Sequence, residues 1–210
     1  DQMRGKRNRL RLQDLDELRH RIDGISNITP IVFAGGGMNS QVRYGANAVT
    51  GQMFGTTANY QDVQKIFPRS GRFLTDSDDA SRRRVVVLGE KMRKDLKLPE
   101  NPEGEFVQIG SEWFKVVGVL EARGEMFGMS QDNYLLMPFQ TALVVNGAVM
   151  QPDLWITFSV NDLEEMDNTK LRVAMLMRQL HQIGDKQPDD FVVEASDMIA
   201  KTFKQISTTI

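Results

Sequence analysis

The chain contains no cysteine, and this absence excludes several classes of protein. A disulfide-stabilised scaffold, a thiol nucleophile and a cysteine-ligated zinc site all require thiol groups. Histidine is scarce as well, since the chain has only His20 and His181. Both lie in segments predicted to be helical, and neither has a second histidine one helical turn away, as a helix-borne metal pair would need. We therefore interpret both histidines as residues of solvated helix faces.

Long apolar runs and a strong net charge are also missing. No segment approaches the roughly 18 consecutive apolar residues that span a bilayer, and no basic-then-apolar signal peptide opens the chain. We therefore expect the polypeptide as given to be soluble. Its net charge of −2 over 210 residues provides no field that would attract nucleic acid. Basic residues do gather within residues 4–11, which is typical of a solvated helix start or of a segment near anionic lipid headgroups.

No recognised catalytic motif is present. The chain contains neither a Gly-x-Ser-x-Gly elbow nor a His-Glu-x-x-His pair. Glu164 and Glu165 begin a predicted helix, where carboxylates complement the helix dipole, so acid–base catalysis is not needed to explain them. Three glycines at residues 35–37 lack the lysine of a phosphate-binding loop, and we interpret them as a hairpin tip. We expect no enzymatic activity, no metal and no cofactor in this chain.

Charged residues are concentrated between two of the predicted strands. Asp76, Asp78 and Asp79 precede three arginines at residues 82–84. Clustered aspartates can bind calcium, but the alternating ligands, central glycine and final glutamate of a calcium loop are absent. The pattern therefore indicates a polar turn whose charges compensate one another.

The apolar pattern indicates an α+β fold, with 40% hydrophobic and 26% charged residues. The spacing of Leu15, Leu18 and Ile22 predicts an amphipathic helix over residues 10–24. Further helices are expected over residues 59–67, after Gly89, over residues 171–183 and over residues 197–210. Short apolar or alternating runs predict strands at residues 28–33, 41–57, 85–88, 106–109, 113–120, 134–138, 153–160 and 191–194.

A polar loop predicted over residues 121–133 carries Met126, Phe127 and Met129. Apolar side chains in such a loop are either tucked over a small core, which we favour, or offered to a partner. Together with Trp155 they are candidates for a partner or ligand surface, because methionine adapts its shape to varied ligands.

The order of five short segments resembles that of a known family. The segments are residues 70–76, residues 85–89, residues 101–110, residues 114–120 and residues 133–138. No single segment is specific, but in this order they resemble the periplasmic core domain of MacB-type ABC transporter permeases. The resemblance is close over residues 68–141 and looser over the flanking parts of the chain.

This resemblance implies an architecture of two subdomains located between the first and second transmembrane helices of a permease. A mixed α/β porter-like subdomain would be formed by both ends of the chain, residues 1–67 plus 151–210. A small β-rich, sabre-like subdomain would be inserted between them, residues 68–150. The opening and closing helices would connect to the membrane stalk, through the apolar residues Leu15, Leu18, Ile22, Phe203 and Ile206.

The resemblance also implies a function on the periplasmic side of the inner membrane. The domain would couple ATP hydrolysis, which uses ATP and magnesium at a separate nucleotide-binding domain, to export of a substrate. Expected partners are its own transmembrane and nucleotide-binding domains, a second copy, a periplasmic adaptor and a TolC-like outer-membrane channel, with no nucleic acid. Alternatives are a lipoprotein-releasing or cell-division relative, a ligand-binding module with its site between the subdomains, and a hydrolase with an unrecognised site.

Overall fold

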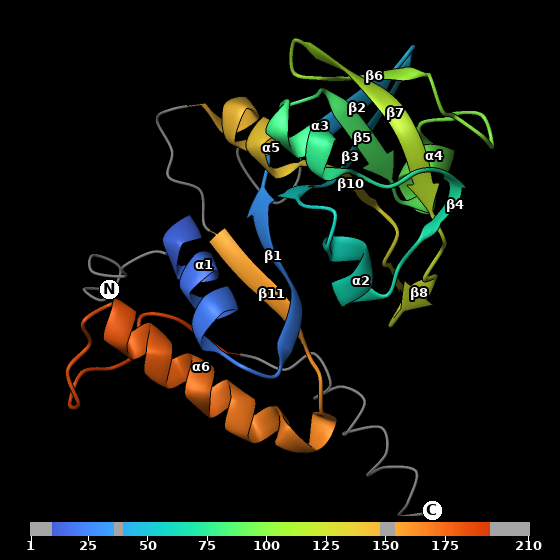
Figure 1. Cartoon of the computed structure of the whole chain (residues 1–210). Coiled ribbons are helices and arrows are strands. Elements are labelled where there is room, and N and C mark those ends of the chain that lie inside the picture. The colour runs from blue at the N-terminus through green and yellow to red at the C-terminus, as the bar shows by residue number, and fades with distance from the viewer. Residues whose placement is uncertain (1–9, 36–39, 148–153, 194–210) are drawn as a thin grey trace, which may run out of the picture. The chain divides into compact units, whose positions relative to one another are not determined.

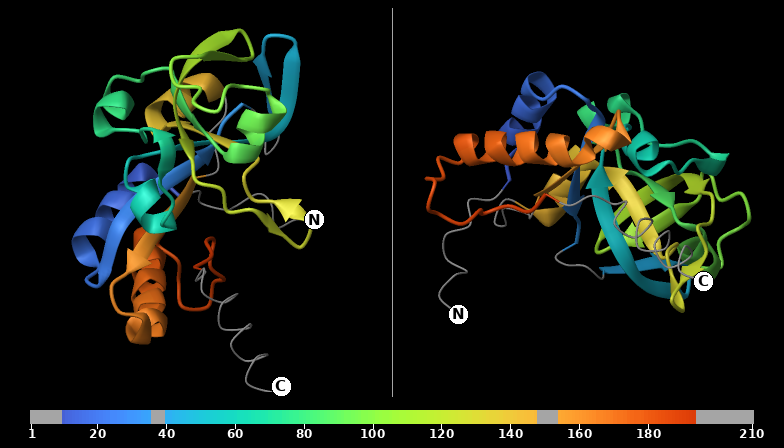
Figure 2. Two further views of the ribbon diagram at one scale, coloured as in Figure 1. Left: turned by 90° about the vertical axis from the view of Figure 1, so that its right-hand side faces the viewer. Right: turned by 90° about the horizontal axis from the view of Figure 1, so that it is seen from below.

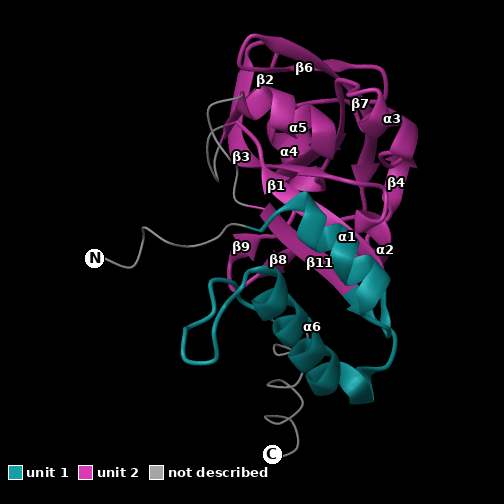
Figure 3. Ribbon diagram, turned by 60° about the vertical axis from the view of Figure 1, so that its left-hand side comes forward, with its two compact units in different colours: residues 1–26, 159–210 teal, residues 27–158 magenta. Residues whose placement is uncertain are grey.

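The computed structural model describes residues 10–35, 40–147 and 154–193. Within it the chain divides into two compact units (Figure 3). Unit 1 comprises residues 1–26 and 159–210, and unit 2 comprises residues 27–158. The closing helix predicted over residues 197–210, with Phe203 and Ile206, lies outside the described residues.

Unit 2 is built around a nine-stranded sheet in which six strands close into a ring (Figures 1 and 2). The neighbours run in the order β10-β5-β7-β6-β2-β3, and β3 pairs again with β10. The ring strands are β2 (Ser40–Tyr44), β3 (Asn47–Thr56), β5 (Val85–Leu88), β6 (Phe106–Ile109), β7 (Glu112–Leu120) and β10 (Tyr134–Pro138). Outside the ring, β1 (Ile25–Phe33) pairs with β3, β11 (Leu154–Val160) pairs with β1, and β4 (Pro68–Gly71) pairs with β7.

Two parallel pairings join distant parts of the ring. β3 runs parallel to β10, with Gln52 opposite Tyr134, and β5 runs parallel to β7. The other neighbours in the ring are antiparallel. Every residue of β5 and β10 is buried, which explains why both sequences are continuously apolar rather than alternating. The most buried strands of unit 2 are therefore those that close its ring.

Most of the predicted elements are confirmed. The prediction of one or two strands over residues 41–57 is resolved as β2 and β3. Two of the three glycines of the hairpin tip predicted at residues 35–37 lie outside the described residues, and the flanking strands β1 and β2 each pair with β3. The strand predicted at residues 191–194 is wrong over residues 191–193, which form neither helix nor strand.

The two compact units meet at residues 26/27 and 158/159, whereas the predicted subdomains meet at residues 67/68 and 150/151. The reason is hydrogen bonding across the predicted boundary, since β2 pairs with β6 and β3 pairs with β10. Residues 27–67 therefore share one sheet with the central part of the chain. The assignment of porter-like and sabre-like subdomains stays a prediction.

Two helices pack on β3 where the strand carries glycine. A Cβ atom at Gly51 would lie 2.3 Å from Cε of Met92 in α4 (Glu90–Asp95). One at Gly55 would lie 2.2 Å from Cβ of Ala142 in α5 (Phe139–Asn146). Both separations are far below van der Waals contact, so these glycines allow the close approach of the helices. The shorter helices α2 (Tyr60–Gln64) and α3 (Asp76–Ala80) complete unit 2.

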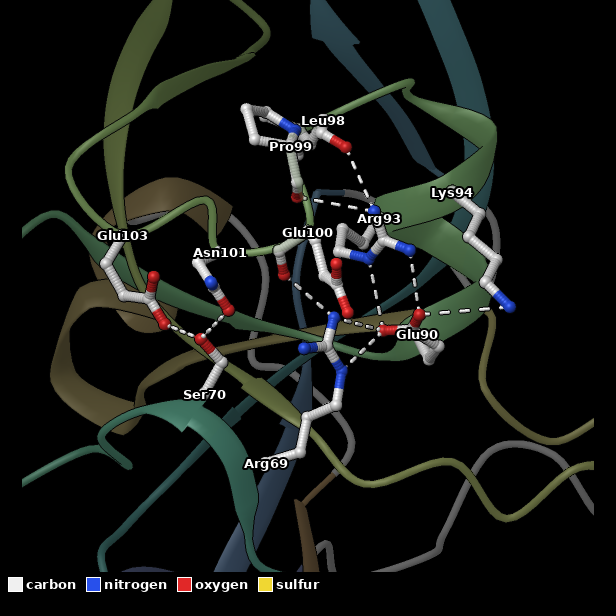
Figure 4. Close-up of polar contacts among 10 residues, drawn as sticks. All are labelled: Arg69, Ser70, Glu90, Arg93, Lys94, Leu98, Pro99, Glu100, Asn101 and Glu103. Atoms are coloured by element: carbon white, nitrogen blue, oxygen red, sulfur yellow. Dashed lines mark hydrogen bonds and ion pairs between the residues drawn. The ribbon is translucent and has the colours of Figure 1, made fainter.

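An ion-pair network ties β4 to α4 (Figure 4). Glu90 accepts hydrogen bonds from Nη2 of Arg69 at 2.9 Å and from Nη2 of Arg93 at 2.8 Å. Arg69 also donates to the carbonyl of Glu100, and Arg93 donates to that of Leu98. Burial would raise the pKa of Glu90, but the hydrogen bonds from the two arginines outweigh it and lower that pKa. The strand, the helix and the loop after it therefore form one braced segment.

The described part of unit 1 consists mainly of two helices, α1 (Leu12–Arg21) and α6 (Met166–Leu180), with the short 3-10 helix η2 (Leu163–Glu165) before α6. Both long helices were predicted from their apolar spacing. Leu15, Leu18 and Ile22 are buried, so the apolar face of α1 is used in packing. None of the described helices is both long and apolar enough to cross a lipid bilayer.

Candidate functional site

The loop that carries three of the predicted surface residues forms a small hairpin. β8 (Glu125–Met126) pairs antiparallel with β9 (Met129–Ser130), and Met126 lies opposite Met129. The hairpin follows the end of β7, so it lies at the opposite end of that strand from the β6–β7 turn (Figure 1). It belongs to a separate two-stranded sheet.

The hairpin turn places an aromatic side chain at its tip. The two turn residues, Phe127 and Gly128, have φ angles of 51° and 77°. Positive φ at both central positions is the requirement of a type I′ turn, whose twist matches that of paired strands. Glycine adopts this conformation freely, but for phenylalanine it costs about 1–2 kcal/mol. The strain at Phe127 has to be offset by the base of the hairpin.

Asp132 holds that base. Its buried carboxylate accepts hydrogen bonds from the backbone N–H groups of Arg123 at 2.8 Å and Gly124 at 2.9 Å. The N–H of Gln131 donates to the carbonyl of Gly124, and this bond also joins the two ends of the hairpin. The guanidinium of Arg123 donates to the carbonyl of Gln64, the last residue of α2. Hydrogen bonds to a carboxylate are stronger than those between neutral groups. These bonds therefore hold the base of the hairpin in a fixed position on unit 2.

The tip itself is exposed. Phe127 is 81% exposed and Met129 is 71% exposed, and Met126 is exposed as well. The expectation that these side chains are tucked over a small core is therefore wrong, because a two-residue turn leaves them nothing to fold back on. The other alternative, that they are offered to a partner, agrees with their exposure. We name Met126, Phe127 and Met129 the hairpin tip.

The fourth predicted surface residue lies elsewhere. Trp155 is exposed on β11, the terminal strand in the sheet order, and packs edge-on against Phe33 with ring centroids 5.9 Å apart. It therefore belongs to the β1–β11 pair, whereas the hairpin tip is a feature of the loop after β7. The structure brings together three of the four predicted residues.

One polar cluster was missed by the sequence analysis. His20 is exposed, as predicted, but His181 is buried at the end of α6 and hydrogen-bonds to Asp14 and Asp190. Its interpretation as part of a solvated helix face is therefore wrong. His181 follows the buried Met177 by four residues, which places it on the buried face of α6, so the helical spacing contained the signal.

Comparison with known proteins assigns the chain to a family. The family model of the MacB-like periplasmic core domain matches residues 1–175. The chain belongs to the MacB-like periplasmic core domain family. The resemblance inferred from five short segments is thereby confirmed, and the chain is the periplasmic core domain of a MacB-like ABC transporter permease.

Several curated relatives support the assignment to the MacB-like family. The macrolide export ATP-binding/permease protein MacB of Bdellovibrio bacteriovorus is 26% identical over 98% of this chain and 31% of its own length. MacB of Syntrophobacter fumaroxidans is 33% identical over 93% of this chain and 34% of its own length. The pyoverdine export ATP-binding/permease protein PvdT of Pseudomonas putida is 29% identical over 75% and 24%, respectively. The chain thus spans about a quarter to a third of these relatives.

Solved structures show the same fold as this MacB-like domain. The periplasmic region of MacB from Actinobacillus actinomycetemcomitans matches with a TM-score of 0.73 and 25% identity, covering 97% of this chain and 86% of that one. The extracellular domain of the noncanonic ABC-type transporter YknZ from Gram-positive bacteria matches with a TM-score of 0.68 and 20% identity, covering 89% and 90%. The second likeness concerns the fold alone.

Proposed function

We propose that this MacB-like domain transmits movement from the membrane part of an ABC transporter to a periplasmic partner during substrate export. ATP hydrolysis at a separate nucleotide-binding domain would drive two copies of the permease together and apart. The domain would pass that movement to an adaptor protein and a TolC-like outer-membrane channel. We expect this chain to contribute neither catalysis nor a cofactor.

The observation that carries the proposal is an exposed apolar tip on a firmly bonded base. A mechanical coupler needs a contact surface that moves with its body rather than independently of it. The hydrogen bonds of Asp132 close the base of the hairpin a few residues after β7 ends, and the closed ring makes β7 part of a continuous sheet. The hairpin tip is therefore suited to carry a displacement of unit 2 to a protein that binds it.

The names of the relatives support the export part of the proposal. They are export ATP-binding/permease proteins, of macrolides for MacB and of pyoverdine for PvdT. We propose the porter-like and sabre-like subdomains, residues 1–67 plus 151–210 and residues 68–150, as the two functional parts of the domain. The root helices would be α1 and a closing helix, and the domain would lie on the periplasmic side of the inner membrane.

The apolar area of the tip is large enough to matter for binding. Fully burying one phenylalanine or methionine side chain contributes about 1.5–3 kcal/mol. Phe127 and Met129 together therefore offer about 3–5 kcal/mol after allowance for incomplete burial, and every 1.4 kcal/mol corresponds to about tenfold in affinity. Loss of both should therefore weaken binding of the partner by roughly two to three and a half orders of magnitude.

The test uses the double variant Phe127→Ser/Met129→Ser in the full-length transporter that contains this domain. Phe106→Ser is the matched control, because Phe106 is 51% exposed but lies on β6. We expect the double variant to lose export and adaptor binding while keeping its ATPase activity and expression level. The control should retain all four.

Two outcomes would count against the proposal. Undiminished export by the double variant would show that the tip is no partner contact. Tight binding of a peptide, lipid or drug by the 210-residue chain, with export independent of an adaptor, would favour the ligand-binding alternative. Transfer of lipoproteins rather than small molecules would favour the lipoprotein-releasing relative.

A further inference from the structure

The imidazole of His181 bridges two carboxylates within unit 1. Its Nε2 lies 3.0 Å from Oδ2 of Asp14, in the first turn of α1. Its Nδ1 lies 2.8 Å from Oδ1 of Asp190, in the segment that follows α6. The side chains of His181 and Asp14 are 0% and 1% exposed, and that of Asp190 is largely buried. One ring therefore bonds to both α1 and the segment that follows α6.

With both carboxylates ionised, this geometry fits one protonation state of the ring. An ionised carboxylate accepts hydrogen bonds but donates none, so each nitrogen of His181 must carry a proton to bond its neighbour. A neutral imidazole has one N–H, and its other nitrogen would point a lone pair at the remaining carboxylate. Because both nitrogens face carboxylates, the ring also has no free nitrogen for a metal ion.

The two carboxylates are not equally dependent on His181. Asp14 also accepts the backbone N–H of Arg11 at 2.8 Å, and the guanidinium of Arg11 lies 3.5 Å away. Among the described residues, Asp190 has His181 as its sole hydrogen-bond partner. When the imidazole loses its second proton, Asp190 is therefore the carboxylate that is released.

The other charged groups beside this cluster on α6 and the loop after it are paired with each other. Arg178 of α6 pairs with Asp189 and donates to the carbonyls of Gly184 and Gln187. It holds the loop up to residue 189 whatever the state of His181. The uncharged ring of Phe191 packs edge-on on the imidazole, with ring centroids 6.2 Å apart. A change in the charge of His181 thus acts on residues 190–193.

We propose that Asp14, His181 and Asp190 form a pH-sensitive latch that fastens residues 190–193 onto α1 and α6. The latch is closed when His181 is positively charged and open when it is neutral. It involves none of the residues of the hairpin tip, so it stands or falls independently of the proposed function. Because the domain is periplasmic, the cytoplasm does not buffer the pH around it. The latch therefore responds to the pH of the growth medium.

The direction of the response follows from the environment of the ring. Burial lowers the pKa of His181, but the hydrogen bonds and charges of Asp14 and Asp190 outweigh it and raise that pKa above the ordinary value of 6.5. Because the pKa is raised in the closed latch, protonation of His181 stabilises the closed latch fully below pH 6.5. This stabilisation is lost as the pH rises through the pKa that His181 has in the closed latch. Between these two values the ratio of open to closed latch rises by up to about tenfold per pH unit.

The latch can be tested on the 210-residue chain by NMR and hydrogen exchange. The chain has two histidines, so a His20→Gln variant leaves His181 as the single imidazole to titrate. We expect its pKa to exceed 6.5. We also expect the opening constant of residues 189–193, corrected for intrinsic exchange, to rise about tenfold or more between pH 6 and pH 8.5. In Asp190→Asn the opening constant should be high and independent of pH.

Three results would overturn the latch. The first is a pKa of His181 at or below 6.5, and the second is an opening constant of residues 189–193 that is the same at both pH values. The third is an Asp190→Asn variant that keeps the full pH dependence. The test does not require replacement of His181, and Asp190→Asn leaves the buried pair of His181 and Asp14 in place.

Discussion

Replacing Asp132 with asparagine should loosen the hairpin without unfolding unit 2. The carboxylate presents one oxygen to the N–H of Arg123 and the other to the N–H of Gly124. Asparagine has the same shape but only one oxygen. One of the two N–H groups will therefore face an amide NH2 group, which is a donor, and that N–H loses its partner.

The magnitude follows from the strength of the bond that is lost. A hydrogen bond to a charged group contributes about 1.5–3 kcal/mol, and a buried donor left unpaired costs a similar amount. Since the N–H groups lie in a partly exposed loop, water compensates in part, and we take about 2 kcal/mol. That energy corresponds to an opening constant about 30-fold higher. Global stability should fall much less, because the hairpin is a separate small sheet.

Native-state amide exchange, read residue by residue at Arg123 and Gly124, measures this opening directly. Asp95→Asn is the matched control, because Asp95 is an exposed aspartate of unit 2 that pairs with Lys91 on the surface of α4. It should leave exchange in the hairpin unchanged. A change of less than about threefold in Asp132→Asn would refute the view that Asp132 carries the base.

Two further predictions concern the body of the domain. Asp78→Ala should lower the free energy of unfolding by about 2 kcal/mol in urea denaturation, because it removes the buried carboxylate bonded to the half-exposed Arg72. Burial would raise the pKa of Asp78, but its hydrogen bonds lower it, so the advantage of the wild type should be complete above pH 3.8 and shrink as the pH falls further; a difference that stays constant below pH 3.8 would contradict this. Gly55→Ala should cost about 1–3 kcal/mol, because its Cβ would overlap that of Ala142, whereas a Cβ at Gly184 would make only an ordinary contact with Gln187, so Gly184→Ala serves as the control; equal melting temperatures of these two variants would count against tight packing of α5 on β3.

Much of the secondary structure could be predicted because its signal is local. The buried runs of β5 and β10 and the spacing of Leu15 and Leu18 in α1 each lie within a few residues. The parallel pairing of β3 with β10 has no such signal, since its register depends on the packing of the whole ring. The subdomain bounds predicted at residues 67/68 differ from the compact units for that reason.

The candidate site was predicted in its residues but not in its form. Met126, Phe127 and Met129 stand out in a polar loop, yet two-residue strands are too short to show alternation. The turn of Phe127 and Gly128 could have been suspected from its glycine alone. His181 was recognisable as buried from its spacing to Met177, but its bond to Asp14, at the other end of the chain, was not.

The closed ring also governs the order in which the domain can be made. β3 emerges from the ribosome early, and its partner β10 follows only after β5, β6, β7 and the hairpin. Until residue 138 is available, the residues of β3 that later pair with β10 form an open edge, and such edges invite pairing with other chains. Pairings between distant strands are also slow to form. A chain whose synthesis stops before β10 should therefore be a substrate for chaperones and proteases. Once β10 has been made, it can pair with β3 and cover that open edge.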